Sequence, residues 1–456
     1  MSDRNTVIGT GFLRPDGQKG IRNRLLVIYT SPYAEFAARS IASAFSPQRV
    51  EVIGFGRCVD SPFTERKLAA YAAHPNVGGV LVVSNGNETI RGAIIAAAAG
   101  EKPHAQLTIS RDGGVVSCIR KGIALAQTVL EELKLVPTAP LTYADLVIGA
   151  ECGGSDATSG LAANPVVGRV YDRLCDLGAT VMFEEMYEAV GLKDVLVSRC
   201  ATPEAAEQIA CTYDKFFQFS EDTNQFFSTP GNMRGGLTTI EEKSMGAVIK
   251  SGTRSIQGIV KIGQRPPHPG LWMMDSMPDT PNGCGPYTSE DATSILVYPT
   301  CGALLTILTS GRGHLISTPV APTIKITGNR ITAQNLHRDI DLDASPVIYG
   351  KETLDSLADQ LMQIILRTAA GELTVGEALG HRDGVINQEE QFDCGGKKYE
   401  LARFSGISSP QRAGGRPQYC AGPAYGELFA PCRGKDLRTG AGRGNPSGAD
   451  RQWNLL

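Results

Sequence analysis

The sequence predicts an α/β fold with two consecutive, mostly parallel, doubly wound (Rossmann-like) sheets that carry helices on both faces. Short apolar runs bounded by turn residues alternate with helix-like segments, and the alternation restarts after two prolines, Pro137 and Pro140. Apolar strands separated by helices are typical of parallel sheets, because the crossover helices cover both faces. Several of the predicted strands also end in Gly-rich polar turns, and open α/β sheets bind ligands at that edge.

The first half of the alternation contains four predicted strands, at 25–30, 50–55, 79–84 and 105–109, and helices at 33–45, 63–73, 90–99 and 114–133. The second strand leads into Gly54-Phe-Gly-Arg-Cys58 and the third into Ser84-Asn-Gly-Asn-Glu88. Both turns are polar and Gly-rich, so both are suited to line a cleft. Neither contains Gly-x-Gly-x-x-Gly or a phosphate-binding loop, which disfavours a nicotinamide cofactor.

The second half contains predicted strands at 144–150, 179–183, 256–262, 271–274, 302–308 and 324–329, with helices at 166–177, 203–217 and 354–369. A further helix is expected to begin after Thr238 or Thr239, because each forms a capping-box pattern with a glutamate three residues later. We therefore divide the chain into a leading segment 1–24, a first α/β domain 25–136 and a second α/β domain 141–383. Residues 384–456 are rich in Gly, Pro and Arg, and we expect a disordered tail there.

Composition excludes several classes of protein. The 456 residues are 42% hydrophobic with a net charge of -3, so a basic surface for nucleic acid or an anionic membrane is not expected. The first residues lack the layout of a signal peptide, and no apolar run reaches the ~20 residues of a membrane span, which favours the cytoplasm. The eleven cysteines include no Cys-x-x-Cys pair, so zinc-ribbon and redox motifs are not expected.

The most informative stretch is Glu151-Cys-Gly-Gly-Ser-Asp-Ala-Thr-Ser-Gly-Leu-Ala-Ala-Asn-Pro165, which joins a predicted strand to a predicted helix. It holds two carboxylates, Glu151 and Asp156, the thiol of Cys152 and three hydroxyl groups. So many polar groups at a buried strand end would be costly without a ligand. The alternative is a well-capped turn, with Ser or Asp at the N-cap and Pro165 in the first helical turn.

This stretch resembles the motif of the altronate/galactarate dehydratase family of sugar-acid lyases, which includes the large subunit of (R)-sulfolactate sulfo-lyase. The resemblance covers residues 8–383, and further motifs agree in the same order: 14–24, 74–76, 231–244, 266–276, 309–314 and 380–382. It implies a hydro-lyase that removes water from a sugar acid to give a 2-keto-3-deoxy acid. It also implies Fe²⁺ (or Mn²⁺), and a homo- or hetero-oligomer.

Three departures from the family pattern refine this expectation. Family dehydratases begin with a small histidine-bearing β-rich domain, so this chain is expected to be a large subunit that needs a separate small, SAF-like partner. The family elements His-x-x-Gly-Cys-Gly and Gly-Cys-Glu read Gly54-Phe-Gly-Arg-Cys58 and Gly86-Asn-Glu88 here, which favours the alternative of a sulfo-lyase releasing sulfite and pyruvate. The third departure is the tail beyond 383. A second alternative is a non-catalytic substrate-binding or scaffold subunit.

For the elimination we expect Glu151, Cys152 and Asp156 to form a polar cluster at the cleft, joined by Glu184 and Glu185 from the next strand end. Glu151 or Glu184 is expected to be a metal ligand or the general base, which requires burial to raise its pKa. The predicted metal ligands are Glu151, Cys152 and Glu185. The predicted substrate-binding residues are Arg22, Asn23, Ser155, Ser159, Asn164, Asn232 and Arg312.

Four histidines lie in or near the family motifs. His74 precedes a proline and is expected to be structural, and His381 is expected to lie at a helix end. His268, between prolines, and His314, in a Gly-rich turn, are candidates for the site.

Overall fold

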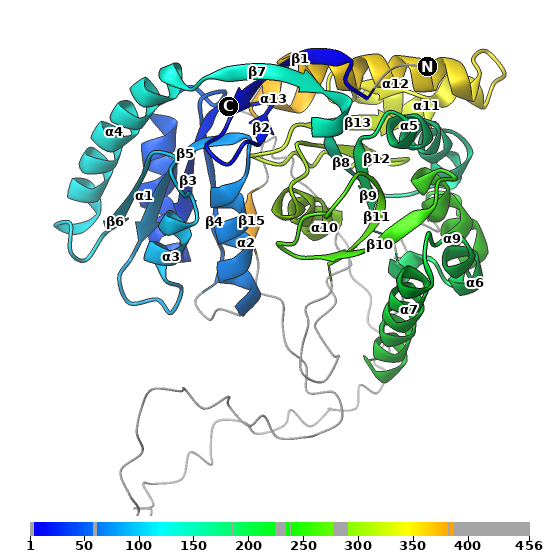
Figure 1. Ribbon diagram of the computed structural model, residues 1–456, viewed down its shortest axis with the longest axis horizontal. Coiled ribbons are helices and arrows are strands. Elements are labelled where there is room, and N and C mark those ends of the chain that lie inside the picture. The colour runs from blue at the N-terminus through cyan, green and yellow to red at the C-terminus, as the bar shows by residue number, and fades with distance from the viewer. Residues whose placement is uncertain are drawn as a thin grey trace, which may run out of the picture. The chain divides into compact units, whose positions relative to one another are not determined.

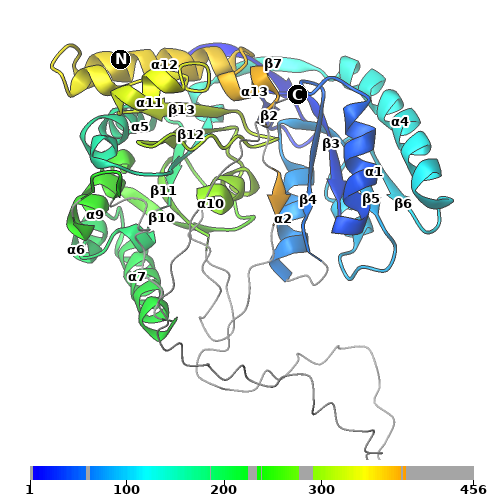
Figure 2. The same cartoon turned by 180° about the vertical axis from the view of Figure 1, so that it is seen from behind.

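The structure is a computed structural model (Figure 1 and, from behind, Figure 2). It describes residues 4–57, 62–184, 186–223, 234–237, 239–276, 291–381 and 384–386. The chain divides into two compact units, Met1–Lys398 and Tyr399–Leu456, and all described residues belong to the first. Asn232, Glu185 and most of the predicted tail therefore lie outside the described residues.

The first sheet has the order β15-β4-β3-β5-β6, and all its neighbouring strands are parallel. Its strands are β3 (Arg24–Tyr29), β4 (Val50–Phe55), β5 (Val77–Ser84), β6 (His104–Thr108) and the two-residue β15 (Val385–Ile386). Its helices are α1 (Pro32–Ser43), α2 (Pro62–Ala73), α3 (Gly92–Ala97) and α4 (Gly114–Glu132). β15 lies inside the stretch that the sequence assigned to the tail.

Helices cover both faces of the first sheet because successive strand side chains point to opposite faces. Leu25 and Val27 of β3 pack with residues of α1 and α4, whereas Leu26 and Ile28 pack with residues of α2 and α3. All four side chains are fully buried. The continuous apolar strand and its four helices therefore form the doubly covered layer that the sequence predicted.

The second sheet has seven parallel strands in the order β10-β11-β9-β8-β12-β13-β14. They are β8 (Val147–Cys152), β9 (Thr180–Phe183), β10 (Ile256–Lys261), β11 (Gly270–Asp275), β12 (Leu305–Thr309), β13 (Thr323–Thr327) and β14 (Leu342–Asp343). Its α-helices are α5 (Asn164–Asp176), α6 (Lys193–Ser198), α7 (Pro203–Thr223), α9 (Ile240–Val248), α10 (Asp291–Val297), α11 (Arg330–Asn335), α12 (Leu354–Ala369) and α13 (Val375–Leu379). Short helical turns are η1 (Leu133–Leu135), η2 (Tyr143–Asp145), η3 (Ser159–Ala163, a π-helix), η4 (Met186–Glu188), η5 (Ile249–Ser251), η6 (Tyr298–Cys301) and η7 (Ser345–Val347).

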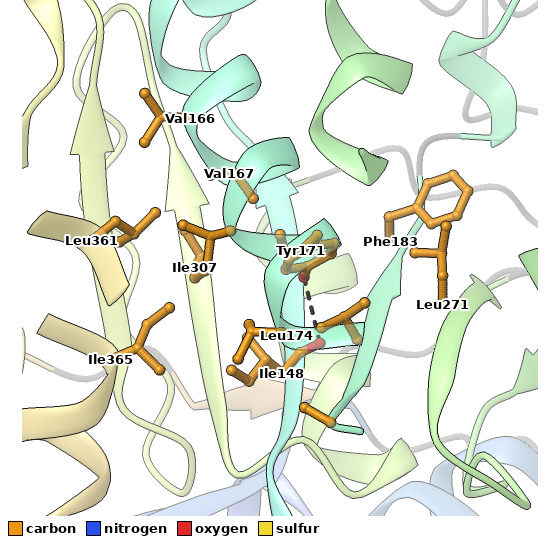
Figure 3. Packing of buried hydrophobic residues seen from close by; sticks show 14 of the residues in the cluster. Ile148, Val166, Val167, Tyr171, Leu174, Phe183, Leu271, Ile307, Leu361 and Ile365 are labelled. Atoms are coloured by element: carbon orange, nitrogen blue, oxygen red, sulfur yellow. Dashed lines mark hydrogen bonds between the residues drawn. The ribbon is translucent and has the colours of Figure 1, made fainter. Parts of the chain in front are cut away.

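Helix α5 packs on one face of this sheet and is the centre of its core (Figure 3). Val167, Tyr171 and Leu174 lie at helical spacing and are fully buried against β8 and β12. The Tyr171 hydroxyl donates to the Met182 carbonyl at 2.8 Å, which satisfies the polar end of a buried ring. Because α5 directly follows the Gly-rich turn after β8, this packing holds the turn at the sheet edge.

A small antiparallel sheet of order β2-β1-β7 differs from the sequence expectation of a polar leading segment and a linker. Its strands are β1 (Val7–Leu13), β2 (Lys19–Gly20) and β7 (Thr138–Thr142). β1 finds its ladder partner in β7, about 130 residues away along the chain, as in the pair Thr10 and Pro140. A pairing between short segments so distant in sequence leaves no local periodic signal.

Expectation and structure agree on an α/β protein with two mostly parallel sheets, and the predicted helix at 354–369 matches α12 residue for residue. The strand predicted at 144–150 instead runs to Cys152, so Glu151 and Cys152 are its last residues rather than part of the turn. The described helices include none of the length and apolar character that a membrane span requires.

Candidate active site

The Gly-rich turn lies where the strand order of the second sheet reverses. The chain passes from β8 to β9 on one side and later adds β12 on the other side of β8. Ligands of open α/β sheets bind at such a switch point, at the carboxyl ends of the strands. Backbone hydrogen bonds join the turn after β8 to the turn after β12. They run from Gly153 N to the Thr309 carbonyl at 2.8 Å and from Arg312 N to the Gly154 carbonyl at 3.0 Å.

Two carboxyl groups, Glu151 and Glu184, lie side by side at this edge. Ala150 of β8 pairs in register with Phe183 of β9, so the next residue of each strand is a buried glutamate. Ser276, just beyond β11, donates to Glu184 Oε1 in a short hydrogen bond. The Tyr298 hydroxyl lies 3.4 Å from Glu151 Oε2 and 2.6 Å from the Ala150 carbonyl.

Burial raises the pKa of Glu184 to about 7, against the opposing effect of hydrogen bonding with Ser276, Ser294 and Glu151. Asp275, also buried at the same edge, raises this pKa further. Within the described part of the chain, the Glu184 Oε2 atom forms no hydrogen bond of normal geometry. A carboxyl group that has a pKa near 7 and an oxygen that accepts no hydrogen bond of normal geometry from the described residues has the properties of a general base at physiological pH.

A second cluster adjoins the first and contains Cys152, Ser155, Glu188 and Lys243. The Lys243 Nζ atom lies 3.1 Å from Cys152 Sγ, 2.8 Å from Ser155 Oγ and 2.5 Å from Glu188 Oε2. The Ser155 hydroxyl also donates to Cys152 Sγ at 3.3 Å. All four residues are buried. Helix α9 contributes the lysine and the η4 turn the glutamate, so three separate segments converge on the end of β8.

The electrostatics of this cluster favour a lysine ammonium beside a neutral thiol. Burial raises the pKa of the Cys152 thiol and the Glu188 carboxylate raises it further, while Lys243 opposes both. For Lys243, burial alone would lower the pKa, but contact with Cys152 and Glu188 raises it above its ordinary value. The result is a lysine ammonium in contact with Cys152, the residue that directly follows Glu151.

Asp156, Ser159 and Asn164, predicted as site residues, hold the turn together in this structure. Asp156 Oδ1 accepts from the Thr158 backbone at 2.9 Å and hydroxyl at 2.6 Å, and Oδ2 accepts from Asn329 at 2.7 Å. The Ser159 hydroxyl lies 3.2 Å from Asp156 N. Asn164 bonds the Gly246 carbonyl at 2.7 Å and accepts from Thr309 at 2.6 Å. These contacts match the capped-turn alternative for this part of the stretch.

Arg22 and Asn23, predicted to bind substrate, lie apart from the cluster between the two parallel sheets. The Arg22 guanidinium pairs with Glu377 at 2.8 Å and donates to the carbonyls of Thr368 and Glu372. Asn23 donates to the Leu133 carbonyl and accepts from Arg14, both at 2.8 Å. Because their polar groups are already engaged in linking elements, we leave both residues out of the proposed site.

Of the other predicted residues, Arg312 is exposed on the turn after β12, and Asn232 and Glu185 lie outside the described residues. His314, also exposed, lies against the Gly-rich turn: a Cβ on Gly154 would come within 2.8 Å of its ring. The His268 ring contacts the Trp272 ring at a tilt, with centroids 4.9 Å apart, near the opposite end of β11. His74 is buried and bonds the Ala303 carbonyl at 3.0 Å, in keeping with a structural role.

The family resemblance implies a divalent metal, which would need several His, Cys, Asp or Glu side chains close together. Among the described residues, no three His, Cys, Asp or Glu side chains lie together in a way that could hold a metal ion. The Cys152 thiol is engaged by Lys243, and Glu185, a predicted ligand, is outside the described part. The described residues therefore do not supply a complete ligand set, and we derive no step through a metal.

Sequence reasoning missed the roles of Lys243, Glu188 and Tyr298. Lys243 lies in the first turn of α9, after the capping residue Thr239, whose side chain accepts from Glu242 N, and charged residues are ordinary at that position. Glu188 belongs to the acidic stretch after β9 and was recognised only as part of it. Tyr298 stands in an apolar segment with no polar neighbour, so no local signal pointed to its contact with Glu151.

Comparison with known proteins identifies the family of this chain. Residues 143–391 match the family model described as D-galactarate/altronate dehydratase, C-terminal. Residues 11–134 match the model of the second domain of D-galactarate dehydratase/altronate hydrolase. The chain therefore belongs to the D-galactarate/altronate dehydratase family, as its motifs predicted.

Among individual relatives, the (2R)-sulfolactate sulfo-lyase subunit beta of Chromohalobacter salexigens is 30% identical over 83% of this chain and 96% of its own length. The altronate dehydratase of Escherichia coli is 28% identical over 82% of this chain and 76% of its own length. The galactarate dehydratase (L-threo-forming) of Escherichia coli is 30% identical over 57% of this chain and 48% of its own length. All three names are those of lyases, and one is that of a subunit.

Proposed function

We propose that the protein is a lyase that removes water from a sugar acid of the altronate or galactarate type and yields a 2-keto-3-deoxy acid. The observation that carries this proposal is the buried carboxyl pair of Glu151 and Glu184, in which the pKa of Glu184 is about 7. Removal of a carbon-bound proton at neutral pH needs a base with this property. The family membership supports the reaction class.

In the proposed reaction, the Glu184 carboxylate takes the proton from the carbon next to the substrate carboxylate. The electron pair of that bond forms the new double bond, and the hydroxyl on the next carbon leaves as water after protonation. The resulting enol becomes the 2-oxo acid by proton transfer. Glu151 supports the base by sharing the proton within the pair, since two adjacent buried carboxyl groups do not both ionise easily.

Negative charge develops on the substrate carboxylate as the proton leaves, and a fixed cation stabilises it. We assign this role to the Lys243 ammonium, held by Glu188 at 2.5 Å and by Ser155 at 2.8 Å. Cys152 fixes the lysine from a third side. Ser155 and Arg312 remain candidates for binding the hydroxyl and acid groups of the substrate, as does Asn232. Asp156, Ser159 and Asn164 act through the turn that carries these groups.

A divalent metal, Fe²⁺ or Mn²⁺, stays a proposal based on family resemblance, as does Glu185 as a ligand. When bound, such an ion would polarise the substrate carboxylate. Elemental analysis of the purified protein, before and after treatment with a chelator, tests it directly. A protein that is fully active after the metal has been removed would end this part of the proposal.

A second candidate reaction releases sulfite and pyruvate from sulfolactate. One observation favours it: the chain is 30% identical to the sulfo-lyase subunit beta over 96% of that subunit, against 28% identity to the altronate dehydratase over 76% of that protein. From the family resemblance we also propose a large subunit that works in the cytoplasm with a separate small β-rich, SAF-like partner, and the name of this relative, a subunit beta, supports an assembly of more than one chain. The two reactions share the proton-removing step and differ only in the leaving group.

The experiment is a turnover assay on altronate, galactarate and sulfolactate, with added Fe²⁺, with and without a co-expressed small β-rich partner. Release of a 2-oxo acid without sulfite supports the dehydratase, and release of sulfite supports the second candidate. Binding without turnover under every condition would contradict both and would favour a non-catalytic binding or scaffold subunit.

A further inference from the structure

A second polar feature lies at the opposite, amino-terminal edge of the first sheet. Two cavities, of about 550 and about 260 Å³, are both lined by Arg14, Pro15, Glu101 and Lys102. The larger one is also lined by Gly78, at the start of β5, and by Pro103, just before β6. The candidate active site is at the carboxyl ends of the other sheet, so these cavities belong to a different place in the fold.

Two cations share the carbonyl groups of the loop between α2 and β5. Lys102 Nζ donates to the carbonyls of Ala72 at 2.7 Å and His74 at 3.1 Å. Arg14 Nε donates to the next carbonyl, that of Pro75, at 2.6 Å. Neutral carbonyls thus hold both charges within one short segment. Lys102 is 8% exposed and Arg14 4%, so both charges are largely shielded from bulk solvent.

Within the part of the chain that the structure describes, neither cation has a carboxylate within ion-pair distance. Asp16 is the acid that acts on both, and Arg265 adds positive charge near Lys102. Glu101 and Glu132, which line the larger cavity, have exposed side chains. His74 is neutral because burial, more than the nearby cations, lowers its pKa well below the ordinary value.

Hydrogen-bonding capacity remains on both cations. Lys102 uses two of its three donors, on the carbonyls of Ala72 and His74. Arg14 uses three of its five, on Pro75, Asn23 and the Arg22 carbonyl. Buried cations that lack a counter-ion and retain donors are suited to an anion, because charge-assisted hydrogen bonds are the strong ones.

We propose that Lys102 and Arg14 form a binding site for the oxyanion group of a small molecule, a carboxylate, sulfonate, sulfate or phosphate. The apolar wall of the cavity, formed by Leu13, Pro15, Val136 and Pro137, accommodates a short carbon chain attached to that group. This site is independent of the proposed lyase reaction. The loop that holds it also links the sheets, since Asn76 donates to the Leu304 carbonyl at 2.8 Å.

The site has a characteristic pH dependence. Burial, together with Arg14 and Arg265, lowers the pKa of Lys102 to about 7, whereas Asp16 opposes this. An anion binds the ammonium form and therefore draws in a proton as it binds. Affinity is expected to be about tenfold weaker at pH 8 than at pH 6, because the ammonium fraction falls by about that factor around a pKa near 7.

The test is isothermal titration calorimetry with sulfate and with pyruvate, in two buffers of different ionisation enthalpy. Lys102→Met keeps the aliphatic stem and removes the charge, and Lys121→Met, at an exposed lysine paired with Asp112, is the matched control. Binding that Lys102→Met weakens at least tenfold, that Lys121→Met leaves unchanged and that takes up a proton supports the site.

Equal loss in both variants would mean an adventitious ion only and would overturn the proposal, as would affinity that does not change between pH 6 and pH 8. The pH profile and the proton uptake are also measured on Glu184→Gln, which removes the other group with a pKa near 7, so they decide the question even where Lys102→Met does not fold. Neither readout depends on turnover, and failure here leaves the proposed lyase reaction untouched.

Discussion

Two of the buried sets of charged side chains in the described part of the protein differ in how completely their charges are matched. Between the parallel sheets, Arg22 and Arg24 both contact Glu377, and Arg24 also lies 3.2 Å from Glu51. This inter-sheet network contains two cations and two anions. At the carboxyl edge of the second sheet, Glu151, Glu184, Glu188 and Asp275 are buried, and the cations there include Lys243 and Lys261.

The difference shows in the pKa values. Burial alone would raise the pKa of Glu377, but Arg22 and Arg24 outweigh it and hold the pKa below its usual range. Among the described residues no arginine or lysine pairs with Glu184 in this way, and burial raises its pKa to about 7. A matched buried charge stabilises the arrangement of two elements, whereas a carboxyl group kept near neutrality is ready to exchange a proton. Arg22 and Arg24, from the motif at 14–24, therefore belong to a matched, structural set of buried charges.

The largest expected effect is on the unmatched carboxyl pair. Glu184→Gln keeps the shape of the side chain and removes the base, so turnover should fall by about 10²–10⁴-fold. The folded state should be retained, because an amide is easier to bury than a carboxylate. Steady-state turnover and the thermal midpoint measure the two effects. Turnover within twofold of the unaltered protein would show that Glu184 is not the base.

The matched network should respond in the opposite way. Glu377→Gln leaves Arg22 buried without its anion and Arg24 with Glu51 alone, so the free energy of unfolding should fall by about 3–5 kcal/mol. Because the pKa of Glu377 is depressed, its contribution is present above the ordinary pKa of glutamate and is lost as the pH falls through the lower, folded-state pKa. Urea unfolding at several pH values measures this. Turnover per folded molecule should be unchanged; a large loss there would contradict the assignment.

A smaller effect follows from pH. The base acts as the carboxylate, so kcat/KM should rise about tenfold per pH unit below pH 7, the pKa of Glu184, and level off above it. The sign for stability is the reverse: a raised pKa favours the protonated folded state, so its stabilisation is lost as the pH rises toward 7. A pH–rate profile with no acid limb between pH 6 and 8 would contradict this.

The smallest effect is expected at Asp156. A substitution there distinguishes the predicted catalytic role of this residue from its role in capping the turn. Asp156→Asn places an amide donor opposite the Asn329 amide, in place of the acceptor at 2.7 Å. The unfolding free energy should fall by about 1–2 kcal/mol, and turnover should change little. Denaturant midpoints and turnover, compared with Asn329→Ala, test this. Loss of turnover in Asp156→Asn but not in Asn329→Ala would return Asp156 to the chemistry.

The sequence alone determined the class of fold and the family. Apolar strands such as 25–30 and helices such as α12 carry their periodicity within a few neighbouring residues, so they are readable locally. The turn after β8 was recognisable as a candidate site because its polar composition is unusual for a strand end. Glu151 and Cys152 were named on that basis and Glu184 because it ends the next strand, and the structure brings all three to one edge.

Only the tertiary structure decided which charged residues face which. Lys243 reaches Cys152 across 91 positions of sequence, and Arg22 reaches Glu377 across 355. Long side chains from distant elements meet because the sheets and helices pack in one particular way, and hydrophobic periodicity carries no record of that meeting. The sequence shows only that Arg22 and Lys243 are charged residues. It does not show that one pairs with a distant glutamate and the other contacts a thiol. Their burial and partners, which separate a structural ion pair from a candidate site, arise only when the chain folds.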